Sequence, residues 1–298
     1  CITPRTRGIL AVHIYGQPAN MTALCNIAKA HGLVVIEDGS QAHGALHKGA
    51  KVGRFGDAAG FSCMGGKLLA SSEAGYMVTP HEAVYWKAAL CGQHTGRSGE
   101  DGFPDALRLY VDSLVYTYRL NPLAAVMLTE QLKKVDGEIE ARRRNVALFR
   151  RAMEGVQSVH FPNYPDGDEP SYHMLTMNFQ LEAAGVSKAT YIRALGAEEV
   201  GIFSYIPSSI NTWRRLQWQD YNGPKVMWTE TLRRHGVDYR QVKVPNCELK
   251  IKRSLEMGWN YTRVNEVGMK QLAWAFYKVE ENLEALREWE TKSNRSSS

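Results

Sequence analysis

The stretch Ile9–Asp38, ILAVHIYGQPANMTALCNIAKAHGLVVIED, decides the fold class of this protein. The apolar runs Ile9–Ile14 and Leu33–Ile36 each predict a buried strand. Between them, Asn20 can cap a helix from Met21 to about Ala30, because an asparagine side chain accepts a hydrogen bond from the open amides of a first turn. A strand, a helix and a second strand in so short a segment predict a βαβ unit with parallel strands and a right-handed crossover.

Asp38 follows the second of these strands directly. In open parallel sheets, ligands bind beyond the carboxyl ends of the strands, so Asp38 is a candidate ligand-binding residue. A turn residue is an equally good interpretation of Asp38 alone, because Gly39 and Ser40 follow it.

The rest of the chain predicts a second domain. A long amphipathic helix is expected from Pro122 to about Gly155. The other expected elements are a short strand over 58–63, a helix over 80–94, a loop over 96–104, strands near 172–179, a helix over 187–195 and a final helix over 265–290 followed by a polar tail. Together they predict an α/β protein: a large domain with a mixed, mostly parallel sheet over 1–128, and a linking helix with a smaller α+β domain over 129–298.

Composition points to an ordinary globular enzyme of 298 residues, with 44% hydrophobic and 22% charged residues. No apolar run approaches the roughly 20 residues that cross a bilayer, and the chain opens with no signal-peptide pattern. The five cysteines are scattered without a CxxC pair, which favours free thiols in a reducing compartment. We therefore expect a cytoplasmic protein without a membrane partner.

The net charge of +5 raises the question of a nucleic-acid partner. The densest basic run is Arg142–Arg144, followed by Arg150 and Arg151 on the same predicted helix. Glutamates and apolar residues are interleaved with it, and no stacking aromatics accompany it. This pattern favours a solvated helix face over a phosphate-binding stripe, so no nucleic-acid partner is expected.

Asp38, Gln41, Ser62 and Lys67 form the constellation that carries chemistry. Pyridoxal phosphate (PLP) needs a lysine amine for a Schiff base, an anion beside its pyridine nitrogen, and hydroxyl and backbone donors for its phosphate. A strand-end aspartate, a serine and a lysine in one α/β domain supply each kind of group. Taken singly, Ser62 is more often a packed hydroxyl and Lys67 a surface lysine.

Two competing motifs fail. Gly60–Lys67 resembles a nucleotide phosphate loop, but the lysine is one position late and Leu68 replaces the serine or threonine that holds magnesium. His43 and His47 are four residues apart, as in some zinc sites, but Gly44 and the turn residues before them argue against a helix, and no third ligand lies close in sequence.

Four motifs in order resemble one family. They are VHIYGQPANM (12–21), VIEDGSQAHGA (35–45), VGRFGDAAGFSCMGGK (52–67) and YRLNPLAAVMLTEQLKKVD (118–136). The sequence resembles the DegT/DnrJ/EryC1/StrS aminotransferases, PLP enzymes of fold type I (aspartate-aminotransferase-like) that aminate keto-sugars and cyclitols. The likeness is strong over residues 2–155 and faint beyond them.

The resemblance implies a role for each candidate residue. Lys67 would hold PLP as a Schiff base and carry protons; Asp38 would pair with the pyridine nitrogen, Gln41 would lie by the ring and Ser62 would contact the phosphate. A lysine at position 67, where the related sugar dehydratases have histidine, matches an aminotransferase. The amino donor would be glutamate or glutamine, and the active sites would be shared within a homodimer.

Substrate contacts are expected from Arg119, which matches an arginine near the family's active site, and from Tyr205 in the segment YIPSS. The chain departs from the family pattern at Thr117, where asparagine is usual, and at Ser208–Ser209, where the histidine of YxPxH is absent. Family members also carry an N-terminal region before a segment like Ile2–Leu10, so we expect such a region to be missing here. A non-catalytic PLP-family protein and a nucleotide-binding α/β protein are the alternatives.

Overall fold

The fold is given by a computed structural model that describes residues 2–92, 95–112, 116, 118–217, 219 and 227–296. Its contacts divide the chain into two compact units. Unit 1 comprises Cys1–Leu148, Asn163–Leu175 and Trp259–Glu266, and unit 2 comprises Phe149–Pro162, Thr176–Gly258 and Val267–Ser298. The predicted domain boundary between residues 128 and 129 stays a prediction.

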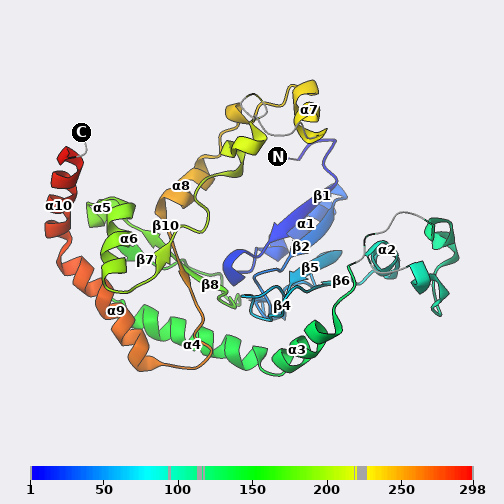
Figure 1. The fold of residues 1–298 in the computed structure, drawn as a ribbon, viewed down its shortest axis with the longest axis horizontal. Helices are drawn as coiled ribbons and strands as arrows, with labels where there is room; N and C mark the ends of the chain where they lie inside the picture. Colours follow the sequence, from blue (N-terminus) through cyan, green and yellow to red (C-terminus); the bar gives the residue numbers. More distant parts are fainter. Residues whose placement is uncertain are drawn as a thin grey trace. The chain divides into compact units, whose positions relative to one another are not determined.

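Unit 1 is built on a four-stranded sheet with the order β1-β2-β5-β6 (Figure 1). The strands are β1 (Gly8–Val12), β2 (Val34–Asp38), β5 (Ala58–Ser62) and β6 (Gly75–Val78). β2 pairs in parallel with both β1 and β5, and β6 pairs antiparallel with β5. The predicted mixed, mostly parallel sheet is confirmed.

Helix α1 (Met21–His31) connects β1 to β2 and completes the predicted βαβ unit. The Asn20 side chain accepts from the Ala23 amide at 3.1 Å, and Gly32 ends the helix in the left-handed conformation at φ 62°, which glycine adopts without the steric cost of a Cβ atom. Ala28 packs with Ala11 and Val35 in a buried cluster under the sheet. The short η1 (Ile14–Gly16) and the hairpin β3 (Leu46–His47) and β4 (Ala50–Lys51) complete this region.

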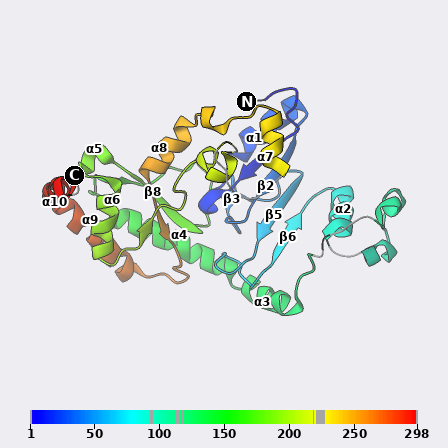
Figure 2. The same ribbon diagram turned by 45° about the horizontal axis from the view of Figure 1, so that its top comes forward.

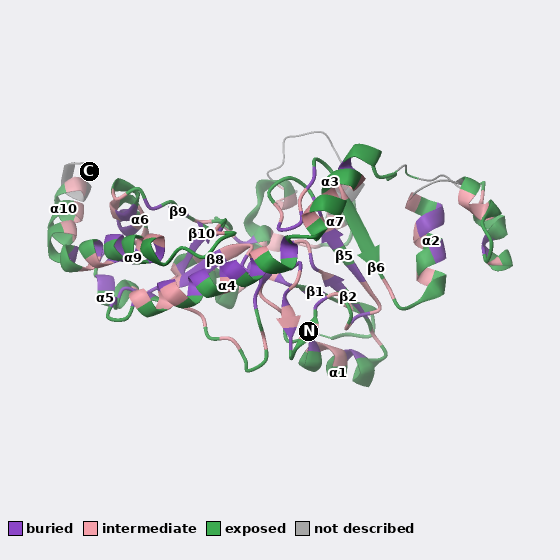
Figure 3. Cartoon of the chain, turned by 90° about the horizontal axis from the view of Figure 1, so that it is seen from below, coloured by how far each residue is buried: buried purple, intermediate pink, exposed green. Residues whose placement is uncertain are grey.

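Among the described residues only one face of this sheet is covered, so the strands predicted as buried are buried on one face alone. Side chains alternate along a strand, and the face beneath α1 is buried. On the other face, Leu10 is 65% exposed and Ile36 is 45% exposed. Figure 3 shows the same exposure along β6, whose four residues are all exposed. An apolar run has the same sequence signature whether one face or both are covered, which is why the sequence did not reveal this.

Beyond β6, α2 (Glu82–Gly92), η2 (Thr95–Gly99) and η3 (Asp105–Tyr110) form a small helical segment. Trp86, Leu90, Phe103 and Leu107 are its buried core. The predicted helix over 80–94 is confirmed for most of its length. The predicted loop over 96–104 instead contains η2, because a 3₁₀ turn needs only a few residues and tolerates polar composition.

The predicted single helix from Pro122 to Gly155 is two helices, α3 (Pro122–Leu132) and α4 (Val135–Ala152) (Figure 2). The break lies at Lys133 and Lys134, whose amides bond to the Gln131 carbonyl in turns. The apolar spacing continues across the break, so periodicity alone does not reveal it. Val135 and Ile139 at the start of α4 are buried in a core cluster with Cys63 and Leu69.

The basic run on α4 is not the predicted solvated face. Arg142 is only 6% exposed, and its guanidinium donates to the backbone carbonyls of Tyr172 and Trp259. Burial lowers the pKa of Arg142 to about 10. Arg143 donates to the carbonyls of Pro170 and Gly44. Arg144 and Arg151 are exposed as predicted, whereas Arg142 and Arg143 bind carbonyl groups inside unit 1.

Unit 2 is built on a second four-stranded sheet with the order β7-β8-β10-β9. Its strands are β7 (Val159–His160), β8 (Met174–Phe179), β9 (Ile202–Phe203) and β10 (Ser254–Gly258), and its helices are α5 (Leu181–Ala184), α6 (Lys188–Ala197), α7 (Met227–Arg234), α8 (Pro245–Arg253), α9 (Glu266–Glu281) and α10 (Leu283–Ser296). The 3₁₀ turns η4 (Ile210–Thr212), η5 (Arg214–Leu216) and η6 (Tyr239–Gln241) lie between β9 and α8. The pairs β7–β8 and β9–β10 are antiparallel, and this α+β unit was predicted. The final predicted helix is divided at Asn282, and the expected polar tail is helical to Ser296. In the part of the chain that the structure describes, no helix is both long and apolar enough to cross a bilayer.

Candidate active site

Asp38 and Ser62 end two neighbouring parallel strands and lie on the open face of the sheet. Asp38 is the last residue of β2 and is paired in register with Gly60 of β5. Ser62 is two residues further along β5, so its side chain points to the same face as the Asp38 side chain. Both side chains are half-buried, as the alternation of burial along β2 and β5 requires.

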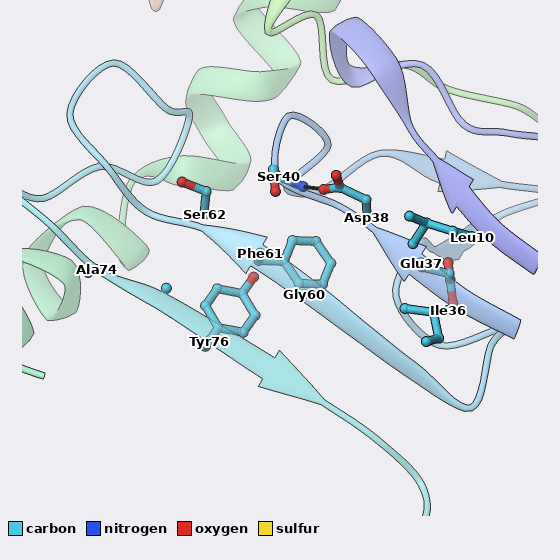
Figure 4. A pocket seen from close by; sticks show the side chains of 11 residues that line it. Leu10, Ile36, Glu37, Asp38, Ser40, Gly60, Phe61, Ser62, Ala74 and Tyr76 are labelled. Atoms are coloured by element: carbon cyan, nitrogen blue, oxygen red, sulfur yellow. Dashed lines mark hydrogen bonds between the residues drawn. The ribbon is translucent and has the colours of Figure 1, made fainter. Parts of the chain in front are cut away.

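A cavity of about 510 Å³ lies at this edge of the sheet, lined by Asp38, Ser62, Phe61 and Tyr76 among others (Figure 4). Its lining combines acidic and hydroxyl-bearing residues with apolar and aromatic ones. Such a mixture is typical of a small-molecule site, in which a few polar groups fix the orientation of a ligand that apolar walls enclose.

The Asp38 carboxylate is held in a fixed orientation. Its Oδ1 accepts a hydrogen bond from the backbone amide of Ser40 at 3.0 Å, drawn as a dashed line in Figure 4. The backbone carbonyl of Asp38 accepts from the amide of His13 at 3.0 Å. No other described residue donates to the carboxylate, so Oδ2 can accept a hydrogen bond from a ligand.

Two stacked aromatic rings form one wall of the cavity. The rings of Phe61 and Tyr76 lie 4.8 Å apart with an interplanar angle of 10°, and Figure 4 shows them side by side on β5 and β6. Tyr76 is 42% exposed as a residue, but desolvation of its partly enclosed phenol, with a smaller contribution from Cys63, raises its pKa to about 12. Tyr76 therefore keeps its proton at neutral pH and can act as a hydrogen-bond donor.

Lys67 lies in the loop between β5 and β6, which is anchored at both ends. The Cys63 amide donates to the Ala74 carbonyl at 2.8 Å, and the Ser71 amide donates to the Cys63 carbonyl at 2.7 Å. Leu69 is buried within the loop. Lys67 itself is half-buried, and no described residue hydrogen-bonds to its Nζ. Because this loop leads into a strand and not a helix, it is not a nucleotide phosphate loop.

Gln41 follows Asp38 by three residues in the chain. The backbone amide of another residue orients its side-chain amide. The side-chain Oε1 accepts from the amide of Tyr15 at 2.7 Å. Tyr15 adopts the left-handed conformation at φ 61°, which is uncommon for a residue other than glycine. Gln41 is 8% exposed and does not line the 510 Å³ cavity.

A buried hydrogen-bonded pair lies beneath the strand ends, and sequence reasoning missed it. His13 Nε2 lies 3.0 Å from Glu37 Oε2, and both side chains are fully buried. The Glu37 carboxylate also accepts from the amides of Gly53, Phe55 and Gly56. The sequence signal was a glutamate at an inward-facing position of a predicted strand, where a charge needs partners.

His43 and His173 are two further residues with perturbed pKa values that the sequence did not assign. Burial and then the charge of Lys67 lower the pKa of His43 to about 4, and the same two causes lower that of His173 to about 4. Both imidazoles are therefore neutral at physiological pH. Among the described residues, no group of three or more His, Cys, Asp or Glu could hold a metal ion.

The remaining candidates do not line the 510 Å³ cavity. Arg119 lines a neighbouring cavity of about 500 Å³ together with Tyr118, and Ala74, Gly75 and Tyr76 line both cavities. Tyr205 belongs to unit 2, where its amide donates to the buried Glu256 at 3.2 Å. Thr117 lies outside the described residues. The structure thus brings Asp38 and Ser62 together, with Lys67 in the next loop.

Comparison with known proteins gives the family. The model of the DegT/DnrJ/EryC1/StrS aminotransferase family matches residues 1–237. The chain belongs to this family. The resemblance seen in the four sequence motifs is therefore confirmed, and the aminotransferases of this family use PLP.

Two curated relatives illustrate the similarity. GDP-perosamine synthase of Vibrio cholerae is 34% identical over 155 residues, which cover 52% of this chain and 40% of that protein. L-glutamine:2-deoxy-scyllo-inosose aminotransferase of Streptomyces lividus is 34% identical over 204 residues, which cover 66% of this chain and 47% of that protein. The matched stretch spans less than half the length of either relative.

A solved structure supports the fold. GDP-4-keto-6-deoxy-D-mannose-3-dehydratase of E. coli with bound hydrated PLP superposes with a TM-score of 0.70, at 20% identity, over 92% of this chain and 68% of that chain. The predicted PLP-dependent transferase fold of type I is therefore confirmed.

Proposed function

We propose that this protein is a PLP-dependent aminotransferase that transfers an amino group from an amino acid to a keto-sugar or keto-cyclitol. The observation that carries the proposal is the placement of the Asp38 carboxylate and the Ser62 hydroxyl around one cavity, with Lys67 in the loop that follows. Family membership and the sugar and cyclitol aminotransferases among the relatives support it.

The donor set fits PLP. Asp38 offers an acceptor oxygen without a described donor, which suits a protonated ring nitrogen. The Ser62 hydroxyl suits a phosphate oxygen, and Lys67 has an amine without a hydrogen-bond partner among the described residues. Three different chemical requirements are thus met by residues from β2, β5 and one loop.

The proposal gives each of these residues a defined role. When bound, PLP supplies an electron sink for negative charge that develops on the substrate carbon. Lys67 holds the cofactor through Nζ and carries a proton on that atom to and from the substrate. Asp38 accepts the ring N–H and keeps the ring protonated. The Gln41 side chain, whose Oε1 accepts from the Tyr15 amide, is proposed to lie beside the ring.

Substrate recognition is assigned to Arg119 and Tyr205. Arg119 is an exposed cation with no hydrogen bond or ion pair to a described residue, in the cavity that adjoins the first one at Tyr76. It suits an anionic group on the substrate or on the amino donor. Glutamate or glutamine is the donor that we propose, as the printed names of the scyllo-inosose enzymes suggest.

A homodimer in the cytoplasm is the assembly and compartment that we propose. Leu123, Val126 and Leu132 of α3 and the neighbouring Tyr118 are 61% to 75% exposed, and exposed apolar patches of this kind mark protein interfaces. The cysteines of the described part, such as Cys25 and Cys63, are free thiols, which agrees with a reducing compartment.

The proposal is tested by a visible absorption spectrum of the protein with PLP, before and after borohydride. We expect a band from an imine between PLP and a lysine in the wild type, trapped by reduction on the peptide that carries Lys67. The band should be absent in Lys67→Ala and present in Lys29→Ala, which removes an exposed lysine of α1. A folded wild-type protein without the band would refute PLP binding.

A second measurement separates an enzyme from a non-catalytic relative. The PLP-loaded protein is incubated with glutamate, and 2-oxoglutarate is quantified before and after a keto-sugar is added. Stoichiometric 2-oxoglutarate followed by renewed production with the keto-sugar is the expected result. PLP binding without any 2-oxoglutarate would favour the non-catalytic alternative.

A further inference from the structure

Two charged residues of unit 2 hold the start of an exposed segment. Glu256 of β10 is 1% exposed, and its Oε2 accepts a hydrogen bond from the backbone amide of Tyr205 at 3.2 Å. Lys188, at the start of α6, donates to the hydroxyl of Ser204 at 2.9 Å. Two consecutive residues just after β9 are thus bonded to a carboxylate and to an ammonium group that come from different elements.

The register of the sheet directs Glu256 toward this segment. Glu256 is paired with Phe203, the last residue of the antiparallel neighbour β9, and directly opposed residues of an antiparallel pair share a face of the sheet. A buried carboxylate needs donors, and the amide of Tyr205, just past the end of the neighbouring strand, supplies one.

Lys188 connects three parts of unit 2. Besides the Ser204 hydroxyl, its Nζ donates to the carbonyls of Ile251 at 2.7 Å and Ser254 at 3.2 Å, so all three N–H groups of the ammonium have acceptors. Helix α6 also packs against β9 (Figure 3). Burial lowers the pKa of the Lys188 amine, and the negative charge of Glu256 opposes this shift, which favours the charged amine.

The segment is held at its other end as well. The carbonyl of Ser209, a residue that is 5% exposed, accepts from the Thr212 amide at 3.0 Å and from the Thr212 hydroxyl at 2.7 Å. Between the two ends, Tyr205 is 42% and Ile206 36% exposed. Pro207 restricts the backbone further, because its ring fixes φ. A short exposed segment is therefore anchored at both ends by hydrogen bonds.

Buried charges are a costly way to stabilise a fold, since an apolar pair of similar volume often stabilises a core equally well. The side chains that follow the two hydrogen bonds are exposed and add little to the core. What the two charged residues do achieve is a fixed backbone conformation at the surface, which is the property of a preorganised binding loop.

We propose that Glu256 and Lys188 are positioning residues for substrate recognition, which fix the backbone conformation in which Tyr205–Pro207 meets the substrate. The inference rests on the proposed function, in which Tyr205 contacts the substrate. The two charged side chains act through the segment and do not touch the substrate, and no covalent bond forms or breaks. Because the segment is ordered before binding, the substrate does not have to order it.

The first test measures amide hydrogen exchange by NMR in the cofactor-free full chain. Glu256→Leu removes the acceptor of the Tyr205 amide. We expect this amide to exchange about tenfold faster than in the wild type, since one hydrogen bond corresponds to roughly one factor of ten. Met177, inside β8 and 0% exposed, is the reference for global unfolding, and its amide should exchange at the wild-type rate.

Matched variants separate positioning from general stability. Glu256→Gln keeps an acceptor oxygen on a side chain of the same length, so the Tyr205 amide should stay protected. Lys278→Met removes an ammonium group that pairs with Glu198 elsewhere in unit 2, and it should leave the Tyr205 rate unchanged.

Ser204→Ala removes only the bond from Lys188 to the segment. The exchange of the Tyr205 amide should rise by about twofold to tenfold. This variant also tests the segment if Glu256→Leu does not fold. An unchanged Tyr205 rate in a folded Glu256→Leu or in Ser204→Ala would overturn the proposal, as would equally fast exchange in Glu256→Gln and Glu256→Leu.

A second test adds PLP, glutamate and a keto-sugar. The probe is GDP-4-keto-6-deoxy-D-mannose, the compound in the name of the superposed E. coli dehydratase. In Glu256→Leu we expect KM for this probe to rise about tenfold and kcat to change by less than about twofold, because a disordered segment weakens binding more than the chemical step. A lower kcat at unchanged KM would overturn the proposal, since it would indicate only a loss of folded enzyme.

Failure of the proposed function gives a different result. A wild-type protein that does not convert the probe would refute the proposed function for this sugar. The exchange measurement needs neither PLP nor a sugar, so it would still decide whether Glu256 and Lys188 fix the segment.

Discussion

His13 and Glu37 form a fully buried hydrogen-bonded pair, with Nε2 of the imidazole 3.0 Å from Oε2 of the carboxylate. The other ring nitrogen, Nδ1, accepts from the Ala19 amide at 3.0 Å, so the imidazole is neutral and Nε2 carries its proton. The pair joins the ends of β1 and β2 directly beneath Asp38. It therefore holds in place the strand ends on which the proposed site depends.

We expect Glu37→Gln to destabilise the protein by about 3–5 kcal/mol, the range for removing one member of a buried pair. The amide presents N–H groups where the carboxylate accepted four hydrogen bonds. Urea unfolding at pH 7 measures the change. Asp136→Asn, which removes an exposed partner of Lys51, is the control and should change stability by less than about 1 kcal/mol. Equal effects of the two variants would contradict the assigned role.

The same pair makes the free energy of unfolding depend on pH in the acidic range. Burial alone would raise the pKa of Glu37, but the hydrogen bonds from His13 and from backbone amides lower it below the ordinary value. A carboxyl group with a lowered pKa in the folded state contributes stability above its unfolded pKa of about 4.5, and this stability is lost as the pH falls through the folded pKa.

His43 and His173 act in a higher pH window. Their pKa falls from 6.5 in the unfolded chain to about 4 in the folded protein, so the unfolded state binds more protons between these values. We expect stability to fall as the pH is lowered from 6.5 to 4, by about 3 kcal/mol for a buried imidazole such as His43. The free energy of unfolding, measured by denaturant at several pH values, should depend less steeply on pH in the double variant His43→Gln, His173→Gln. An unchanged slope would mean that neither imidazole is buried neutral.

Gly16 is expected to tolerate no side chain. Its φ is +89°, and a Cβ atom would lie 2.8–2.9 Å from Ser171 Oγ and the amides of Tyr172 and His173. Gly16→Ala should therefore lower the free energy of unfolding by more than about 3 kcal/mol, through backbone strain and overpacking together. Gly32→Ala is the control for strain alone, because its φ is +62° and no atom lies within 4 Å of its Cβ. It should cost about 1 kcal/mol.

Leu69 is expected to anchor the loop that carries Lys67. It is 7% exposed and packs with Cys63, Val135 and Ile139. Leu69→Ala should destabilise the protein by about 2–5 kcal/mol, whereas Leu109→Ala, at a leucine that is 74% exposed, should change stability by about 0.5 kcal/mol or less. Thermal unfolding of both variants gives the comparison. A neutral Leu69→Ala would mean that the loop is held by its backbone hydrogen bonds alone.

Asp38→Asn is expected to lower the rate of amino transfer about 100-fold or more, because an amide cannot stabilise a protonated ring as a carboxylate does. Single-turnover formation of 2-oxoglutarate from glutamate measures this rate. The exposed Asp105→Asn is the matched control and should leave the rate unchanged, since Asp105 only pairs with Arg108 on the surface. Comparable rates in Asp38→Asn and the wild type would remove Asp38 from the proposed site.

Much of unit 1 could be predicted because its signals are local. The cap at Asn20, the helix end at Gly32 and the apolar runs on both sides are read from neighbouring residues, and they predict β1, α1 and β2. Asp38 follows from this pattern, because a parallel pair brings strand ends to one edge of the sheet. The role of Lys67 was reached only through the family motifs, since a lone lysine carries no signal of its own.

The features that were missed depend on partners far along the chain. Arg142 is buried because carbonyls at residues 172 and 259 surround its guanidinium. The break between α3 and α4 comes without an interruption of the apolar spacing, and Val135 after it packs with Cys63 and Leu69. The residues that neighbour Arg142 and Val135 in the sequence give no indication of these distant contacts.

The sequence by itself determined the order of the elements, the parallel pairing of β1 and β2, the strand-end position of Asp38 and the family. These follow from hydrogen bonding and burial within about thirty residues, which the pattern of caps, turns and apolar positions records. Only the tertiary structure decided which face of the sheet is open, that His13 and Glu37 are paired, and that His43 is buried against Phe61 and Cys63. A side chain's partner is set by the packing of distant segments, and the same local pattern is compatible with many such partners.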